Sequence, residues 1–205
     1  MTTALLVLAG YLAGSMPFGY WVVRLVTGED IRTKGSGNIG ATNVWRSYGW
    51  RLGVPIIVLD VAKGFVPAFV AMLVVDDLAG VLAGAAAMAG HWRPLFLGFT
   101  RGGKTVATAG GVFLALAPLV GLTALAIWIV SFLVFRYASL ASMLASSAMP
   151  FFAWLLGEPW PVIVFAAIAA AAVVVLHRPN IARLLRGQEP RFNLRRRGTP
   201  AGAGG

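Results

Sequence analysis

The chain has three polar, glycine-rich segments, at Thr33–Gly49, His91–Lys104 and His177–Arg191. Each combines glycine and Asn, Ser or Thr with lysine or arginine, so each offers hydrogen-bond donors and positive charge but few acids. Backbone N–H groups of glycine-rich turns, together with cationic side chains, bind phosphate and other oxyanions. The three segments therefore indicate a site for anionic ligands, positioned by the apolar segments between them.

The first segment contains three glycines within six residues, which lets the backbone fold tightly and aim successive N–H groups at an anion. An arginine eleven positions after its first glycine can hold a phosphate through two parallel hydrogen bonds. Irregular backbone beside hydrocarbon must be buried or line a wet cavity, which favours binding over a simple turn. The candidate phosphate-binding residues here are Ser36, Gly37, Asn38, Thr42, Asn43 and Arg46.

The second segment ends in Gly-Gly-Lys-Thr immediately before an expected helix, an arrangement that resembles the closing half of a phosphate-binding loop. The full pattern G-x-x-x-x-G-K-T matches Gly98–Thr105. No strand is expected before it, so an ATPase is not indicated. We predict phosphate binding by Gly102, Gly103 and Lys104.

The third segment follows the last apolar run and begins with His177, a candidate general base. An interfacial histidine without a catalytic role is an equal alternative. Asn180, one turn on, is placed to orient this histidine or to bind substrate. Glu189 is expected to pair with a nearby arginine, and Arg183 to be an ordinary anchor at the membrane surface. In another polar helix end, Ser142 is a candidate donor to a substrate.

Asp60 and Lys63 are spaced three residues apart within an apolar stretch, so they can pair on one helix face. We expect this pair to support the basic pocket structurally. Asp60 is the only acid inside a helix near the basic face, which argues against a metal site. Because the chain has no cysteine, it has no thiol nucleophile or disulfide. No metal or cofactor is expected.

The composition is typical of an integral membrane protein, with 59% hydrophobic and 12% charged residues and a mean hydropathy of +0.80. The 17 basic residues exceed the 7 acidic ones, as in proteins whose cytoplasmic loops face anionic lipid; nucleic-acid binding is not indicated. We expect one polytopic catalytic domain over residues 1–191 and a basic, disordered tail over 192–205.

The positions of charges between apolar runs predict seven short transmembrane helices in an all-α fold. Asp76 and Asp77 have no basic neighbours and mark the outer side. Both ends of the run Val106–Phe135 are basic, so we expect two crossings with a turn near Pro118; a single kinked helix is the alternative. The N-terminus is then outside and the C-terminus cytoplasmic. The other apolar runs are Thr2–Val26, Gly53–Val75, Leu78–Gly90, Met143–Leu156 and Val162–Leu176.

The chain resembles the acyl-phosphate:glycerol-3-phosphate acyltransferase family of bacterial membranes from Gly14 to Arg191. Three long motifs in the same order make this resemblance specific. The motifs are Gly35–Asn43, Gly90–Thr108 and His177–Leu184, with Gly187 and Glu189.

The resemblance implies a seven-helix enzyme of the bacterial cytoplasmic membrane with its active site on the cytoplasmic face. It implies that Ser36, Arg46 and Lys104 handle phosphate, and that Gly102 and Gly103 shape the second loop. It also implies that Ser142, His177 and Asn180 line the reacting centre, with Glu189 structural.

The reaction implied by the resemblance joins an acyl group from acyl phosphate to the 1-hydroxyl of glycerol 3-phosphate. Either His177 or a substrate phosphate takes the hydroxyl proton, and the second is favoured because the anhydride is already reactive. An acyl-enzyme on Ser36 is a third route, and an anion transporter is the rival from another class. We expect a monomer that contacts membrane lipid and the enzyme that produces acyl phosphate.

Overall fold

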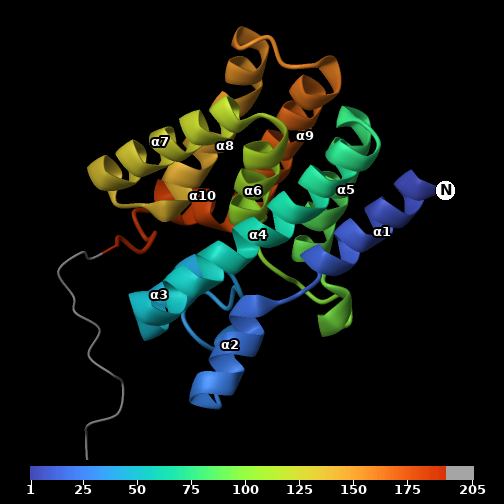
Figure 1. Cartoon of the computed structure of the whole chain (residues 1–205). Coiled ribbons are helices and arrows are strands. Elements are labelled where there is room, and N and C mark those ends of the chain that lie inside the picture. Colours follow the sequence, from blue (N-terminus) through green and yellow to red (C-terminus); the bar gives the residue numbers. More distant parts are fainter. Residues whose placement is uncertain (193–205) are drawn as a thin grey trace, which may run out of the picture.

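The computed structural model describes residues 1–192, which contain ten α-helices, two short 3₁₀ helices and no strand (Figure 1). The expected tail lies outside these residues from position 193 onward. The helices are α1 (Thr2–Gly14), α2 (Phe18–Thr27), η1 (Ile31–Thr33), α3 (Ala41–Tyr48), α4 (Trp50–Val74), α5 (Asp77–Trp92), η2 (Leu95–Leu97), α6 (Val106–Leu116), α7 (Pro118–Phe135), α8 (Ala138–Leu155), α9 (Trp160–Leu176) and α10 (Arg178–Leu185).

The described helices include four segments that are long and apolar enough to cross a membrane: Thr2–Thr27, α4, α7 and α8. Helices α9 and α10 add a fifth if they form one span with a 57° bend. On α7, Leu119, Val130 and Val134 each expose about 60% of their surface, an apolar face that lipid covers favourably. The chain is therefore an all-helical, multi-span integral membrane protein.

The long apolar run Val106–Phe135 is divided into two helices, as predicted. Helix α6 ends at Leu116, and α7 begins with Pro118 in its first turn. Proline lacks a backbone N–H, so it cannot continue the hydrogen bonding of α6 but fits the first position of α7.

The first apolar run is interrupted, although the sequence predicts a continuous one. Helix α1 ends at Gly14, and α2 starts at Phe18, immediately after Pro17. The physical reason is the one that applies at Pro118: proline removes a donor and its ring clashes with the preceding turn. Thr2–Thr27 as a whole remains one candidate span.

Helices α4 and α6 pack closely because glycine faces the contact on both sides. A Cβ on Gly64 would collide with the carbonyl oxygen of Thr108, and one on Gly111 with that of Val61. This close approach places the polar middle of α4, with Asp60 and Lys63, beside the first turn of α6.

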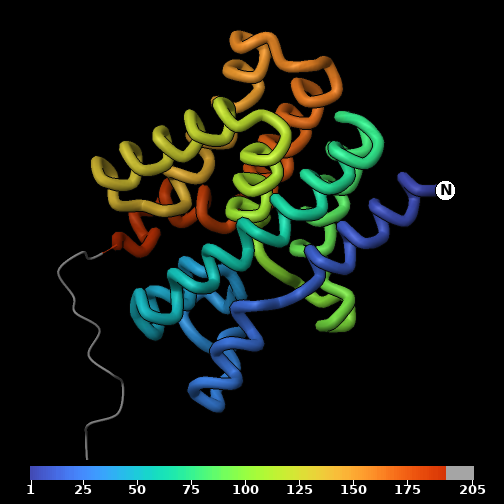
Figure 2. Tube along the Cα trace, viewed as in Figure 1, coloured from blue at the N-terminus to red at the C-terminus, as the bar shows by residue number. Residues whose placement is uncertain are grey.

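The three polar segments lie at one end of the helical bundle. In Figure 2, α10, α3 and the loop before α6 lie toward one end, whereas the α4–α5 and α8–α9 turns lie toward the other. The α4–α5 turn carries Asp76 and Asp77.

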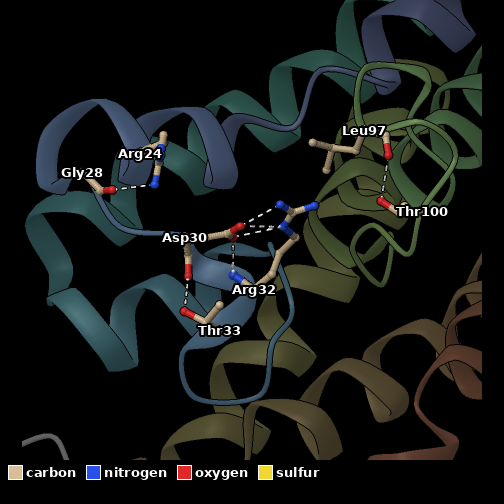
Figure 3. A network of polar contacts seen from close by, with 7 residues as sticks. All are labelled: Arg24, Gly28, Asp30, Arg32, Thr33, Leu97 and Thr100. Carbon is tan, nitrogen blue, oxygen red and sulfur yellow. Dashed lines mark hydrogen bonds and ion pairs between the residues drawn. The ribbon is translucent and has the colours of Figure 1, made fainter.

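A network of polar contacts shapes the connection between α2 and α3 (Figure 3). Asp30 caps η1 by accepting from the backbone N–H of Arg32 at 2.9 Å and also pairs with its guanidinium at 2.6 Å. Arg24 donates to the carbonyl of Gly28 at 2.6 Å. Leu97 of η2 packs against the apolar cluster beneath this connection, which includes Ile31. The first and second polar loops thus pack on the same apolar cluster.

Candidate active site

The three polar loops meet around one pocket of about 120 Å³. It opens at the end of the bundle where α10 and the loop before α6 lie. The lining residues are Ser36, Gly37 and Asn38 from the first loop, Arg101, Gly102 and Lys104 from the second, and Pro179, Asn180 and Arg183 from the third.

Asn43 braces the first loop from within. Its side-chain oxygen accepts from the N–H of Ser36 at 3.0 Å, and its side-chain nitrogen donates to the carbonyls of Lys34 and Asn38 at 3.0 and 2.9 Å. Both donors and the acceptor of the amide are therefore used inside the loop. The sequence predicts a phosphate ligand at this position, but the structure places Asn43 beneath the loop, where it shapes the Ser36–Asn38 turn.

Asn38 joins the first loop to the second. Its side chain accepts from Gly40 N–H at 2.8 Å and donates to the carbonyl of Gly102 at 3.3 Å. Ser36 and Gly37, which precede it, are exposed on the pocket wall. The first loop therefore presents a small hydroxyl and backbone to the cavity, held in register with the second loop.

Lys104 is the most deeply placed cation of the pocket. Burial lowers the pKa of its ammonium group to about 8. The carboxylate of Glu189 opposes this shift, whereas three like charges reinforce it, those of Arg183, Arg101 and Arg46. The pocket therefore carries an excess of positive charge, which an anionic ligand would offset.

Gly102 and Gly103 bring the second loop against the end of α5. The N–H of Gly102 donates to the carbonyl of Trp92 at 2.9 Å, and that of Gly103 to the carbonyl of His91 at 3.0 Å. The sequence predicts that these glycines bind phosphate, but both N–H groups are engaged within the protein. Only Gly102 reaches the pocket lining, and the two glycines shape the loop.

The third loop contributes a buried hydrogen-bonded chain. Lys104 donates to the side-chain oxygen of Asn180, whose nitrogen donates to Glu189 at 2.7 Å. Ser139 and Arg183 donate to the same carboxylate at 2.7 Å each. Burial alone would raise the pKa of Glu189, but these hydrogen bonds together lower it. The carboxylate thus stays charged and fixes both Asn180 and Arg183.

His177 is buried at the junction of α9 and α10, with 3% of its surface exposed. Its Nδ1 lies 2.8 Å from the carbonyl oxygen of Val173. Because a carbonyl only accepts, Nδ1 carries the proton, and in the neutral ring Nε2 is left as an acceptor. His177 does not line the pocket, but it directly precedes the α10 turn that does.

Three other predicted site residues lie outside the pocket lining. The hydroxyl of Ser142 donates to the carbonyl of Ala138 at 2.7 Å and accepts from Trp128 at 3.1 Å, so it is held within the α7–α8 pair. Thr42 is exposed on α3. Arg46 donates to the carbonyl of Pro190 at 3.0 Å, and it acts on the pocket through its charge.

Arg101, Pro179 and Arg183 line the pocket without having been predicted to do so. Arg183 was expected to be an anchor at the membrane surface, but its guanidinium binds Glu189, and its side chain is only 35% exposed. A basic residue next to a predicted phosphate loop indicates a candidate pocket residue. The sequence does not reveal which of these basic side chains turn toward the pocket.

The predicted pair between Asp60 and Lys63 is present, at 2.8 Å with both side chains almost fully buried. Lys63 also donates to the carbonyl of Met16 at 2.9 Å. Among residues 1–192, no three His, Asp or Glu side chains come together as a metal site would need.

An apolar groove of about 270 Å³ runs between α5 and α9, close to the polar pocket. Thr105, which follows the pocket residue Lys104, lines its polar end together with Trp92. The rest of the groove is aliphatic and aromatic. It is lined by Ala85, Met88, Ala89, Phe165, Ile168, Ala169, Ala172, Val175 and Leu176.

Comparison with known proteins gives consistent matches along almost the whole chain. A sequence profile described as glycerol-3-phosphate acyltransferase matches residues 4–187. The chain is 46% identical to the glycerol-3-phosphate acyltransferase of Desulforudis audaxviator, over 91% of this chain and 93% of that protein. It is 43% identical to the corresponding protein of Aquifex aeolicus, over 94% of this chain and 100% of that protein.

Two solved structures are similar in fold as well as in sequence. One is a crystal structure of PlsY (YgiH), an integral membrane glycerol 3-phosphate acyltransferase, in its glycerol 3-phosphate form. It matches with a TM-score of 0.90 at 42% identity, over 94% of this chain and 96% of that chain. The lysophosphatidic acid form matches with a TM-score of 0.86 at 41% identity, over the same shares of the two chains.

Proposed function

Since the chain belongs to the glycerol-3-phosphate acyltransferase family, we propose that it transfers a fatty acyl group from acyl phosphate to the 1-hydroxyl of sn-glycerol 3-phosphate. The products are lysophosphatidic acid and inorganic phosphate, and the reaction begins phospholipid biosynthesis. Acyl phosphate is a mixed anhydride and is already activated, so the enzyme requires no cofactor. Its main task is to bring two anions together and align a hydroxyl with a carbonyl.

The polar pocket supports this proposal most directly. Lys104, Arg101 and Arg183 line it, and Glu189, the nearby carboxylate, is already bound by three side chains. The positive charge is therefore in excess and is available to phosphate. Ser36 and the backbone of Gly37 add neutral contacts from the first loop.

The apolar groove between α5 and α9 is the proposed place of the acyl chain. It begins at Thr105, one residue after the phosphate-binding lysine. An acyl phosphate with its chain in the groove would carry its phosphate toward the pocket. The scissile carbonyl would then lie where lipid meets the polar loops.

In the transfer step, the C1 hydroxyl oxygen attacks the acyl carbonyl carbon, and the bond from that carbon to the phosphate oxygen breaks. The hydroxyl proton ends on the departing phosphate. A substrate phosphate is our preferred base, because His177 stands behind the pocket and attack on an anhydride requires little base strength. The neutral Nε2 of His177 then supports Asn180 or a bound substrate by hydrogen bonding.

Substituting His177→Ala tests this choice of base. If a substrate phosphate takes the proton, kcat falls but the pH dependence of kcat between pH 3.5 and 8 keeps its shape; this range includes the pKa of His177, which burial lowers to about 4. If the imidazole is the base, the acidic limb of the kcat profile disappears with the ring. Near-full kcat in the variant would remove His177 from the reacting centre altogether.

The proposed topology has seven crossings, made by Thr2–Thr27, α4, α5, α6, α7, α8 and α9. Helix α6 has 11 residues and spans about 17 Å at ~1.5 Å per residue, less than the ~30 Å hydrocarbon core. The second loop and the pocket occupy the remaining depth, on the cytoplasmic side of the bacterial inner membrane. We also propose that the protein is a monomer and that it contacts the enzyme that produces acyl phosphate.

The decisive experiment measures phosphate release by the purified protein supplied with palmitoyl phosphate, with and without glycerol 3-phosphate. Palmitoyl-CoA serves as the control donor. Release that requires both substrates and yields lysophosphatidic acid is expected, with no product from palmitoyl-CoA. A folded preparation that produces no lysophosphatidic acid from acyl phosphate would refute the proposed donor.

A further inference from the structure

The side chain of His91 packs beneath the second loop, against Gly103. It is 4% exposed, and its carbonyl oxygen accepts from the N–H of Gly103 at 3.0 Å. A Cβ placed on Gly103 would collide with Nε2 of the His91 ring and lie 2.6 Å from Cε1 and 2.8 Å from Cδ2. The three nearest atoms all belong to this ring, so Gly103 rests directly on the imidazole.

The other edge of the His91 ring faces the buried ion pair of α4. Nδ1 of His91 lies 3.8 Å from Oδ1 of Asp60, and Asp60 lies 2.8 Å from Nζ of Lys63. Lys63 in turn donates to the carbonyl of Met16, between α1 and α2, at 2.9 Å. The side chains of His91, Asp60 and Lys63 are no more than 5% exposed. A buried contact chain therefore runs from the α1–α2 junction through α4 and α5 to Gly103.

We propose that His91 is a positioning residue of the transfer reaction. Its ring sets the height of the Gly102–Lys104 backbone and so places the ammonium group of Lys104 in the pocket. Asp60, 3.8 Å from Nδ1 and paired with Lys63, lies behind the ring. The inference rests on the proposed role of Lys104 in phosphate binding, and His91 itself contacts no substrate.

The position of Gly103 matters because it determines the position of Lys104. Lys104 is the residue after Gly103, so a displaced Gly103 moves Lys104 with it. A misplacement of about 1 Å in a positioning group can cost on the order of a hundredfold in rate. Gly102 and Lys104 face the pocket, whereas His91 supports the same backbone from the opposite side.

A double-mutant cycle between His91→Asn and Gly103→Ala tests the proposal. Asparagine retains a polar atom near the position of Nδ1, facing Asp60, but lacks the ring atoms that meet Gly103. Gly103→Ala alone forces its Cβ into the ring, and we expect kcat/KM to fall at least tenfold. His91→Asn alone leaves a gap under the loop and is expected to lower kcat/KM by a similar factor.

The double variant is expected to be compensated, because the methyl group added by Gly103→Ala fits the space that the ring vacates. Its kcat/KM should exceed the product of the two single effects by tenfold or more. If the loss of kcat/KM in the double variant equals the product of the two single losses, the proposal is overturned. It is also overturned by single variants that lower only the melting temperature and leave kcat/KM per folded molecule unchanged, since the ring would then be a structural filler.

Gly102→Ala is the matched control, one residue away on the same loop. A Cβ there would collide with the backbone carbonyl of His91, which His91→Asn does not remove. The Gly102→Ala/His91→Asn pair should therefore be multiplicative. Compensation there as well would point to general loosening of the loop and overturn the specific role of the ring.

Lys104→Ala separates this inference from the proposed function. If Lys104→Ala leaves the kinetics of both substrates unchanged, the phosphate site has been assigned wrongly, and the positioning role of His91 falls with it. If Lys104→Ala is strongly impaired while the His91–Gly103 cycle is multiplicative, only the role of His91 is refuted.

Discussion

At the scale of single residues, the site works by keeping positive charge in excess where it is needed. Glu189 binds Ser139, Asn180 and Arg183, while Lys104 donates to the neutral oxygen of Asn180. Burial therefore destabilises the charged form of the Lys104 ammonium group and lowers its pKa to about 8. A bound phosphate would relieve this cost.

The lowered pKa of Lys104 predicts an alkaline limit to activity. In the proposed site the charged form of Lys104 binds phosphate, and its pKa is about 8. As the pH rises through 8, the lysine loses its proton, so kcat/KM should fall about tenfold per pH unit above this value. The measurement is kcat/KM for each substrate between pH 6.5 and 10.

Lys104→Arg provides the control, because a guanidinium stays charged throughout this range. Its kcat/KM is expected to start lower, since its geometry differs, but to remain level above pH 8. An alkaline decline of the same shape in Lys104→Arg would assign the limit to another group.

The lowered pKa of Glu189 predicts that the folded protein loses stability at acidic pH. This pKa is lower in the folded protein than in the unfolded chain. The stabilisation is therefore present above the unfolded pKa of about 4.5 and is lost as the pH falls through the folded value. Glu189→Gln leaves buried donors poorly satisfied, which typically costs about 1–3 kcal/mol.

Thermal unfolding of the detergent-solubilised protein at pH 7 and pH 3 measures this effect, because the loss occurs below pH 4.5. The wild type should be destabilised between these values more than Glu189→Gln, which has no carboxylate to protonate at this position. Equal melting temperatures of the two proteins at pH 7 would show that Glu189 does not support the fold.

At the scale of helices, proline positions account for what sequence reasoning could and could not predict. Pro118 divides a run whose basic ends already required a turn, so the break was predictable. Pro17 lies in a run with no such charge signal, and its break between α1 and α2 was missed. The inward turn of Arg183 depends on Glu189, a contact that exists only in the folded chain.

The site residues show the same division. Loop composition identifies Ser36, Asn38 and Lys104 as pocket residues, because small, polar and basic residues in glycine-rich turns have few other uses at a membrane. Asn43 has the same residue type as Asn38 but faces inward and braces the loop. Residue type and spacing do not distinguish these two directions.

The groove between α5 and α9 predicts a dependence on acyl-chain length. Ala172 lines it, and Ala172→Phe would fill part of its length. We expect KM for palmitoyl phosphate to rise at least fivefold, with a much smaller change for decanoyl phosphate. Kinetics with both donors check this.

The neighbouring Ala171→Phe is the matched control, because Ala171 is exposed and does not line the groove. It should leave both KM values near those of the wild type. An equal effect of Ala172→Phe on both donors would place the acyl chain elsewhere.

At the scale of the whole molecule, the charged turns predict orientation in the membrane. The chain has no cysteine, so a single introduced thiol reports its own location. In right-side-out vesicles, a membrane-impermeant maleimide should label Asp77→Cys at once and Gln188→Cys only after permeabilisation. The reverse pattern would place the pocket on the outer face.

The three loops that form the pocket are far apart in the chain, and this separation has a consequence for biosynthesis. Glu189, which fixes Asn180 and Arg183, follows all ten helices of the described structure. The ribosome therefore adds Glu189 only after all ten α-helices have been translated. A nascent chain halted before residue 189 would hold the loops but lack the carboxylate that orders them. Competence for lipid synthesis thus arises late, when translation has passed the last helix.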